Sequence, residues 1–434
     1  MEVRNKSLKL YNTAKKIISG GTMLYSKRPE LYLPNKWPTY FYKSKDCYLW
    51  DIDGNRYIDM LFAVGTNTLG YANKEIDNLV INYIKKGNMT SLNSPEEVEL
   101  AKLLLKLHPW SDQVKFTRSG GEANAAAIRI ARASTSRQNI AFCGYHGWHD
   151  WYLSSNLNNK KNLDTHLMSN LKFEGVTKNL KNTSFPFLYN DFAGLKKIVK
   201  KNNIGIIIME VMRNIPPKNN FLHKVRKLCN QKKIILIFDE CTSGFRECLG
   251  GKHLEFKVNP DLVMFGKAMG NGYAINAILG KSKYMKNSEK SFISSTSWTE
   301  RIGNIAALST IKYMKKYKTY KFIKQQGLKI KSMWKKISNK YHVEIDVISL
   351  DSIPIFIFKN NHNIKKTYLT QEMLKAKILA SNIIYVSIFH EDKIINKYFR
   401  NLDSIFKILS ETKITEIKKK IKGGESYSPM TRLN

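Results

Sequence analysis

Long apolar runs, cysteine pairs and acidic residues are all scarce in this sequence of 434 residues. No stretch of about 18 apolar residues is free of charge, which excludes a membrane-spanning helix. The segment after Met1 has no apolar core of the kind found in signal peptides, so nothing marks the chain for secretion. The five cysteines include no C-x-x-C pair, which argues against a disulfide framework or a zinc site. The sequence therefore predicts a protein of the reducing cytoplasm.

Basic residues outnumber acidic residues by a wide margin: 72 Lys and Arg against 35 Asp and Glu give a formal charge of +37. A charge of this size is typical of proteins that bind nucleic acids. However, only 13 of the basic residues are Arg. Proteins that recognise bases and phosphates favour Arg, because its planar side chain can donate two parallel hydrogen bonds. The 59 lysines are spread along the whole chain. We interpret them as a solvated basic surface and expect no nucleic-acid partner.

Three parts are expected along the chain. Residues 1–70 form an N-terminal segment, a helix followed by a two-stranded hairpin, which joins the small domain. Residues 71–315 alternate helical patterns with short continuous apolar runs, which is typical of a parallel sheet covered on both faces. Residues 316–434 are expected to form a smaller α+β domain, with helices near 371–381 and 402–420. The predicted fold class is α/β, with a mainly parallel sheet in a large domain and a smaller α+β domain.

A turn rich in small residues follows the expected strand 114–117. Ser119, Gly120 and Gly121 lie in this turn and open an Ala-rich helix. Unpaired backbone N–H groups and the helix dipole allow such a turn to bind a phosphate group. Taken alone, the pattern also fits a tight strand–helix turn that binds nothing.

Aromatic and histidine residues follow the next expected strand, 140–143. Tyr145 and His146 belong to this group and are suited to stack on a planar ligand at a strand end. An aromatic corner of the core explains them equally well. His146 and His149 also raise the question of a metal, but no carboxylate or cysteine completes a set at ligand spacing. We therefore expect no metal site.

Acidic residues and a lysine follow three further apolar runs. Glu210 and Asp239 each come directly after such a run. An acid in this position commonly caps a helix or forms a structural pair, but it can also hold a cationic ring nitrogen. Lys267 emerges from the run 262–265 into a Gly-rich turn, where burial lowers the pKa of its amine. A lowered pKa is what a lysine needs to form a Schiff base.

In chain order, these features are a turn that can bind phosphate, aromatic side chains that can stack on a ring, an acid that can pair with a pyridinium nitrogen and a lysine that can form a Schiff base. Each feature is modest alone, but pyridoxal phosphate chemistry requires the whole set. The sequence therefore predicts pyridoxal 5'-phosphate as the cofactor, with Lys267 at its aldehyde and Asp239 at its ring nitrogen.

The order of these motifs resembles that of the class III, fold-type I aminotransferases, and within them the glutamate-1-semialdehyde 2,1-aminomutase group. The resemblance covers nearly the whole chain, from the hairpin at 50–59 onward. It implies that Lys267 carries the cofactor and that Asp239 binds its pyridine nitrogen, as the catalytic pair. The full set of expected cofactor contacts is Ser119, Gly120, Gly121, Tyr145, His146, Glu210, Asp239, Lys267 and Thr296.

The resemblance also bears on partners and substrate. Thr296 matches a residue that reaches the cofactor phosphate of a partner subunit, which implies a homodimer with shared active sites. Gly121 stands where Thr or Ser is common. Arg28 is out of register with an Arg that holds the substrate carboxylate, and Asn271 interrupts a turn that is usually Gly-Gly-Gly-Leu. The expected ligands are therefore a small-molecule amino donor and a carbonyl acceptor of unassigned identity.

Three functional hypotheses follow. The first is an aminotransferase that works through the Lys267 Schiff base on a small biosynthetic carbonyl or amino substrate. The second is a true glutamate-1-semialdehyde 2,1-aminomutase, which moves an amine within one molecule and needs no external donor. The third, of another class, is a non-catalytic basic binding protein. The third is disfavoured because Asp239, Lys267 and the phosphate turn are all present.

Overall fold

The computed structural model describes residues 5–169 and 171–427. Within these residues the chain forms two compact units, one built from 74–321 and the other from 5–73 together with 322–427. Segments near both ends of the chain therefore belong to the same unit. In the described ranges, no helix is long and apolar enough to cross a membrane.

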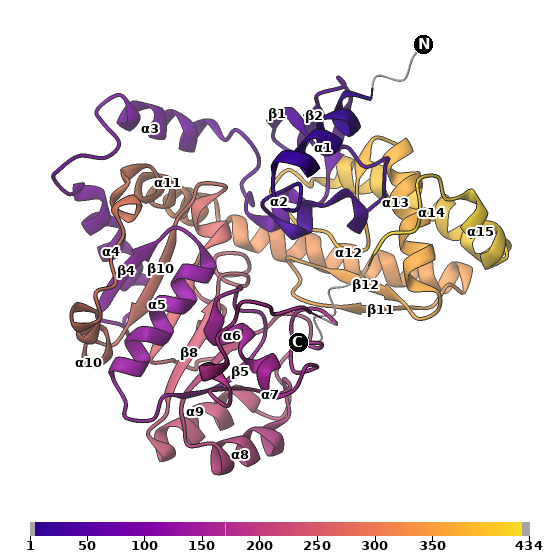
Figure 1. The fold of residues 1–434 in the computed structure, drawn as a ribbon. Helices are drawn as coiled ribbons and strands as arrows, with labels where there is room; N and C mark the ends of the chain where they lie inside the picture. Colours follow the sequence, from indigo (N-terminus) through magenta and orange to yellow (C-terminus); the bar gives the residue numbers. More distant parts are fainter. Residues whose placement is uncertain (1–4, 170, 428–434) are drawn as a thin grey trace. The chain divides into compact units, whose positions relative to one another are not determined.

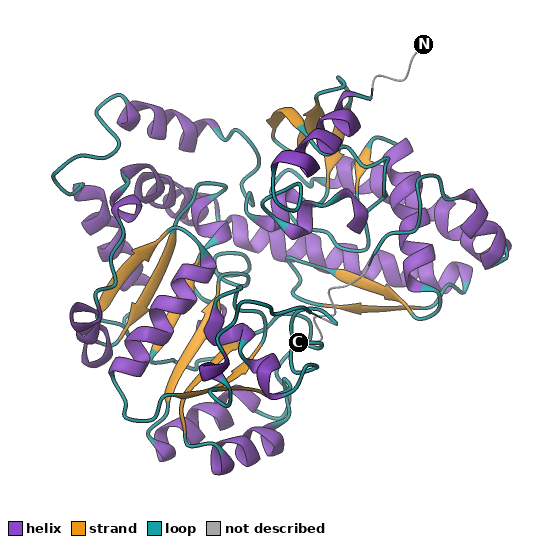
Figure 2. Ribbon diagram, in the orientation of Figure 1, coloured by secondary structure: helices purple, strands orange, loops and turns teal. Residues whose placement is uncertain are grey.

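A seven-stranded sheet forms the centre of the unit 74–321, and its strand order is β4-β10-β9-β8-β7-β5-β6 (Figure 1 and Figure 2). Strand β10 is antiparallel to both of its neighbours, and the remaining pairs of neighbours are parallel. The sheet confirms the predicted α/β class with a mainly parallel sheet. The strands are β4 (Gln113–Thr117), β5 (Asn139–Cys143), β6 (Ser184–Pro186), β7 (Ile204–Glu210), β8 (Ile235–Glu240), β9 (Leu262–Phe265) and β10 (Asn276–Gly280).

Both faces of this sheet are covered, which explains its continuous apolar runs. Along β8, Ile235 and Ile237 pack in one core cluster with the Ala-rich helix α5 (Gly120–Ala133), while Leu236 and Phe238 point to the opposite face and are equally buried. Figure 1 shows α5 lying over β8 and β10, which it contacts. The other helices of this unit are α3 (Lys74–Ile84), α4 (Pro95–Leu107), α6 (Asp150–Leu153), α7 (Ser155–Asn158), α8 (Phe192–Lys201), α9 (Phe221–Lys232), α10 (Ser282–Met285) and α11 (Arg301–Tyr317).

The other unit is an α+β arrangement with two small sheets. One sheet has the order β1-β2-β3-β13, and the second pairs β11 with β12. The strands are β1 (Phe41–Lys45), β2 (Tyr48–Asp51), β3 (Arg56–Asp59), β11 (Ile345–Ile348), β12 (Ile355–Phe358) and β13 (Ile378–Leu379). The helices are α1 (Lys6–Ile17), α2 (Phe62–Gly65), α12 (Thr319–Tyr341), α13 (His362–Lys375), α14 (Asp392–Glu411) and α15 (Ile414–Lys420).

The helix expected near 371–381 is wrong in its bounds. Helix α13 ends at Lys375, and Ile378 and Leu379 form strand β13 instead. This strand pairs in parallel with β3, from the beginning of the chain. A pairing partner more than 300 residues away decides the conformation here, and local sequence does not reveal it.

The parallel pairing places chemically useful residues along one edge of the large sheet. Glu210 ends β7, Asp239 lies near the end of β8, and Lys267 follows β9 by two residues. Because carboxyl ends of parallel strands meet at the same edge, these side chains gather where open α/β sheets bind ligands. Helix α5 also begins at this edge, after β4, whose Thr117 pairs with Asn276.

Candidate active site

Lys267 is the first residue of a short 3-10 turn, Lys267–Gly270, directly after β9. Its backbone has a φ of 43°, a left-handed conformation that is uncommon for residues other than glycine and is found disproportionately at functional sites. Its amine donates a hydrogen bond to Oγ1 of Thr242 at 2.9 Å. Withdrawal from water lowers the pKa of the Lys267 amine to about 8. About a tenth of the amine is therefore uncharged at pH 7, far more than for a lysine in water.

Asp239 presents a buried carboxylate that accepts three hydrogen bonds. Its Oδ2 accepts from Asn124 Nδ2 and from His146 Nδ1, both at 2.9 Å, and its Oδ1 accepts from the backbone N–H of Cys241 at 3.0 Å. Burial by itself raises the pKa of Asp239, but the hydrogen bonds led by His146 outweigh burial and hold this pKa below its usual value. The carboxylate is therefore an anion, fixed in orientation and able to stabilise a nearby cation.

His146 is fully buried and lies against Asp239. Its second ring nitrogen, Nε2, is 3.2 Å from the carbonyl oxygen of Cys143 at the end of β5. Each ring nitrogen thus faces an acceptor, and the ring cannot turn without losing one of them. The structure therefore places the predicted residue His146 behind the carboxylate of Asp239, as its positioning partner.

The turn that opens α5 is held by its own side chains. Ser119 is the N-cap and its Oγ accepts from the N–H of Glu122, while Glu122 Oε2 accepts from the N–H groups of Ser119 and Arg118. This capping box fixes the start of the helix. Gly120 and Gly121 occupy the first two positions of the helix, where backbone N–H groups have no partner within the helix and suit an anion.

A side chain at either glycine of this turn would contact a neighbouring side chain. A Cβ atom at Gly120 would lie 3.5 Å from Sγ of Cys241, two residues beyond Asp239. A Cβ atom at Gly121 would lie only 2.9 Å from Cε1 of His149, so the ring of His149 fills the space that a side chain there would need. This contact explains why glycine stands at a position where the resembled family commonly has Thr or Ser.

Glu210 contacts residues that follow two neighbouring strands, β5 and β7. Its Oε2 accepts from the backbone N–H of Tyr145 at 3.2 Å, and its Oε1 forms an ion pair with Arg213 Nη1 at 2.9 Å. The same Nη1 atom lies 3.5 Å from Oγ1 of Thr242, the hydroxyl that accepts from Lys267. The positive charge of Arg213 therefore sits close enough to Lys267 to oppose protonation of its amine.

Thr296 is exposed in a 3-10 turn, Thr296–Thr299, and its carbonyl accepts from Oγ1 of Thr299. Among the described residues, no contact joins it to Lys267 or Asp239. The end of its turn is nevertheless tied to the strand before α5, because Arg118 Nη2 donates to the carbonyl of Trp298 at 2.8 Å. Of the predicted residues, the structure gathers the others at one sheet edge and leaves Thr296 outside that network.

Sequence reasoning missed several members of this network, namely Asn124, Thr242 and Arg213. Thr242 follows Asp239 by three residues, and Arg213 follows Glu210 by three, so their proximity in the chain was visible. Their orientation toward Lys267 was not. In residues 5–169 and 171–427, no group of three or more His, Cys, Asp or Glu side chains is arranged to hold a metal ion.

Comparison with known proteins matches residues 34–377 to the family described as aminotransferase class-III. A 3-aminobutyryl-CoA aminotransferase of Cloacimonas acidaminovorans is 35% identical over 381 residues, which cover 84% of this chain and 88% of that protein. The chain belongs to the class-III aminotransferase family. A glutamate-1-semialdehyde 2,1-aminomutase of Wigglesworthia glossinidia brevipalpis is 32% identical over 430 residues, covering 92% and 97% of the two chains.

Solved structures confirm the fold of this family member. The PLP-containing FumI protein of Sphingopyxis sp. MTA144 superposes with a TM-score of 0.84 at 22% identity, covering 93% of this chain and 97% of that chain. A glutamate-1-semialdehyde aminomutase of Pseudomonas aeruginosa PAO1 gives 0.80 at 14% identity, with coverages of 93% and 94%. The fold is fold-type I, and the protein is a pyridoxal-phosphate-dependent aminotransferase or aminomutase, as the sequence predicted. The hypothesis of a non-catalytic binding protein is thereby set aside.

The residues at the sheet edge fit this cofactor. Asp239 offers a buried anion for a ring nitrogen, Lys267 offers an amine with a lowered pKa, and α5 offers a capped N-terminus with glycine at its first two positions. An aldehyde, a basic ring nitrogen and a phosphate have matching partners in these three features.

Proposed function

We propose that this enzyme is an aminotransferase whose chemistry centres on Lys267 and Asp239 and acts on a small biosynthetic carbonyl or amino compound. One observation carries the proposal: an ionised buried carboxylate lies near the end of β8, and an amine with a pKa of about 8 lies just beyond the end of the adjacent parallel strand β9. Bound pyridoxal phosphate supplies an aldehyde and an electron-accepting ring. Asp239 holds a proton on the ring nitrogen. The Lys267 amine would anchor the cofactor and, once released, would take the proton from the carbon next to the substrate nitrogen and return it to the carbon of the former aldehyde group.

The remaining residues hold these two groups in place. Ser119, Gly120 and Gly121 bind the phosphate at the N-terminus of α5, and Tyr145 covers a face of the ring. His146 acts through Asp239, because its hydrogen bond fixes the carboxylate and favours its charged form. Fixed donors and charges of this kind need no rearrangement during the reaction.

Arg213 is the proposed site for a substrate carboxylate. Its guanidinium lies beside Thr242, which holds the Lys267 amine, so a carboxylate bound there would place the rest of a small molecule within reach of Lys267. Glu210 orients Arg213 and neutralises it when no carboxylate is bound. Planar paired donors make Arg well suited to this role.

The visible absorption spectrum, measured before and after borohydride, tests the anchor. We expect a yellow band that borohydride removes, with the reduced adduct on the peptide containing Lys267. Lys267→Ala should abolish turnover and the reducible band while the protein stays folded, whereas the control Lys197→Ala on α8 should change neither. An adduct on another lysine, or substantial turnover by Lys267→Ala, would refute the proposal.

The aminomutase alternative is favoured by the full-length similarity to enzymes of that name. The two reactions are separable with glutamate-1-semialdehyde supplied alone. An aminomutase converts it without an external amino donor. An aminotransferase converts a carbonyl substrate only when a donor is added, so donor-dependent product formation supports the first hypothesis.

A homodimer with shared active sites completes the proposal. Large apolar side chains of the unit 74–321 are strongly exposed: Phe292 is 90% exposed, Leu92 82% and Trp148 71%. We propose that a second copy of the chain covers these side chains in the dimer. In that dimer, Thr296 of one subunit reaches the cofactor phosphate of the other. Light scattering coupled to gel filtration tests it, and a monomer that retains full activity would contradict it.

A further inference from the structure

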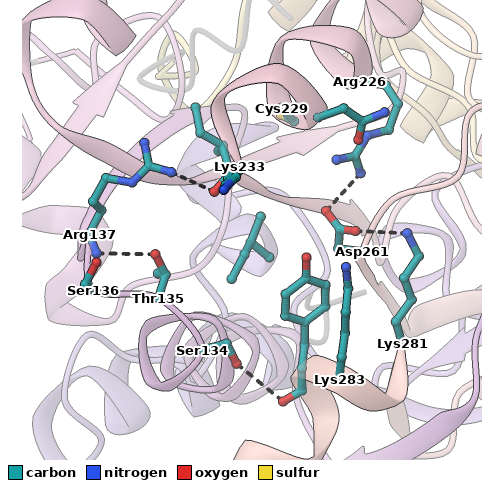
Figure 3. A pocket seen from close by; sticks show the side chains of 14 residues that line it. Ser134, Thr135, Ser136, Arg137, Arg226, Cys229, Lys233, Asp261, Lys281 and Lys283 are labelled. Atoms are coloured by element: carbon teal, nitrogen blue, oxygen red, sulfur yellow. Dashed lines mark hydrogen bonds and ion pairs between the residues drawn. The ribbon is translucent and has the colours of Figure 1, made fainter.

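A cavity of about 630 Å³ lies in the unit 74–321, away from Asp239 and Lys267 (Figure 3). It is bordered by Ile235, where β8 begins, and by Asp261, directly before β9. The active-site residues follow the opposite, carboxyl ends of these strands. At roughly 3.3 Å per residue, the four steps along β8 from Ile235 to Asp239 put about 13 Å between the two sites. The cavity is therefore separate from the cofactor site.

The cavity is strongly positive. A single carboxylate, that of Asp261, faces five basic side chains, which are Arg137, Arg226, Lys233, Lys281 and Lys283. Clefts lined by charges of one sign concentrate ions of the opposite sign. Its volume lies within the range of small-molecule sites, and its walls also offer hydroxyl groups.

Asp261 organises one wall of the cavity and leaves an excess of positive charge there. Its Oδ2 pairs with Arg226 Nη1 at 2.9 Å and accepts from the N–H of Leu236, and its Oδ1 pairs with Lys281 Nζ at 3.0 Å (Figure 3). Burial alone raises the pKa of Asp261, but these cations and the backbone donor hold it below its usual value. One negative charge thus fixes two positive side chains. In addition, Arg226 Nε is buried and has no hydrogen-bond partner among the described atoms.

The opposite wall holds a second fixed cation. Arg137 Nη2 donates to the carbonyls of Lys232 and Lys233 at the end of α9, each at 2.6 Å, so its guanidinium is held against the helix terminus (Figure 3). Lys233 and Lys283 border the same space, and neither forms an ion pair with a described residue. Fixed guanidinium groups with adaptable ammonium groups nearby are a typical receptor for phosphate oxygens.

We propose that this cavity binds a small organic phosphate, with a diphosphate group between the Arg226–Asp261–Lys281 wall and Arg137. The excess of positive charge favours an anionic ligand over a cationic one. The recessed position of Arg226, only 16% exposed, favours a small molecule over the backbone of a nucleic acid. The proposal does not depend on the reaction catalysed at Lys267.

The test is calorimetric titration of the enzyme loaded with pyridoxal phosphate, at physiological ionic strength, with pyrophosphate and with adenosine diphosphate. The bound pyridoxal phosphate occupies the phosphate site at the N-terminus of α5, so any binding measured here occurs at the second site, the cavity beside Asp261. The double variant Lys233→Gln/Lys283→Gln removes two charges from the cavity. The control Lys197→Gln/Lys200→Gln removes two exposed charges from α8, outside the cavity.

We expect one saturable site per chain in the unmodified enzyme and in the control, and at least tenfold weaker binding in the cavity variant. Equal affinity for the two probes would assign recognition to the phosphates alone, and tighter binding of the nucleotide would add its base or sugar. Equal weakening in both variants would show that general surface charge is responsible and would overturn the proposal. Absence of saturable binding in the loaded enzyme would also overturn it. An unchanged cofactor absorption band during titration separates this result from any failure of the proposed reaction.

Discussion

The substitution Asp239→Asn tests whether the charge of this carboxylate, and not its shape, serves the reaction. The amide keeps the acceptor for the backbone N–H of Cys241 but turns an N–H₂ group toward Asn124 and His146. Both neighbours can adapt. His146 can accept at Nδ1 while it donates from Nε2 to the Cys143 carbonyl. A flip of Asn124 would bring its buried, unpartnered Oδ1 into use, at the loss of the 3.2 Å hydrogen bond from its Nδ2 to the carbonyl of His146.

The fold should therefore survive the change with a loss of about 1–2 kcal/mol in the free energy of unfolding, the cost of exchanging charge-assisted hydrogen bonds for neutral ones. The reaction should lose far more. A cation that loses its buried partner is destabilised by about 3–5 kcal/mol, and each 1.36 kcal/mol is about tenfold in rate. We expect kcat/KM to fall by about two to four orders of magnitude.

The assay combines donor-dependent turnover of the loaded enzyme with urea unfolding of the same samples. The expected result is a folded Asp239→Asn protein that still carries the cofactor on Lys267 but is nearly inactive. Retention of more than a tenth of the activity would refute the assignment of Asp239 to the ring nitrogen. Loss of folding along with activity would refute the argument that its neighbours adapt.

Three further outcomes are expected. Gly121→Thr should weaken cofactor binding about tenfold or more, because its Cβ would meet His149, and adding His149→Ala should restore binding in a cofactor titration. Arg213→Gln should raise KM about 10- to 100-fold for substrates with a carboxylate and should change KM much less for amines without one, and equal effects on both would contradict the assignment. The rate at which cofactor-free enzyme takes up pyridoxal phosphate should rise with pH and level off above about 8, because the uncharged form of the Lys267 amine is the reactive one. A stopped-flow absorbance series measures this rate, and a flat profile between pH 6 and 9 would contradict the lowered pKa.

The family, the cofactor and the class of fold were all determined by the sequence. The apolar runs of β7 and β8 end at Glu210 and Asp239, and the run of β9 leads through Gly266 to Lys267. Strands β7 and β9 lie where these runs predicted them. Glu210, Asp239 and Lys267 could be singled out for this reason alone. The local sequence carries this information because a strand that is buried on both faces is apolar at nearly every position.

Contacts between distant segments were decided only by the tertiary structure. His146 lies 93 residues from Asp239 in the chain, and Lys267 lies 25 residues from the hydroxyl of Thr242 that it contacts. The pairing of β13 with β3 overrides the helix expected near 371–381. No local pattern encodes such pairs, because each depends on which elements pack together.

The distribution of the basic residues also depends on which elements pack together. The sequence shows an excess of lysine and arginine and nothing about where they meet. Folding leaves most lysines on the surface but brings Arg137, Arg226 and Lys281 to the amino ends of the strands around Asp261. Composition determined the sign of the charge, and packing determined where it forms a site.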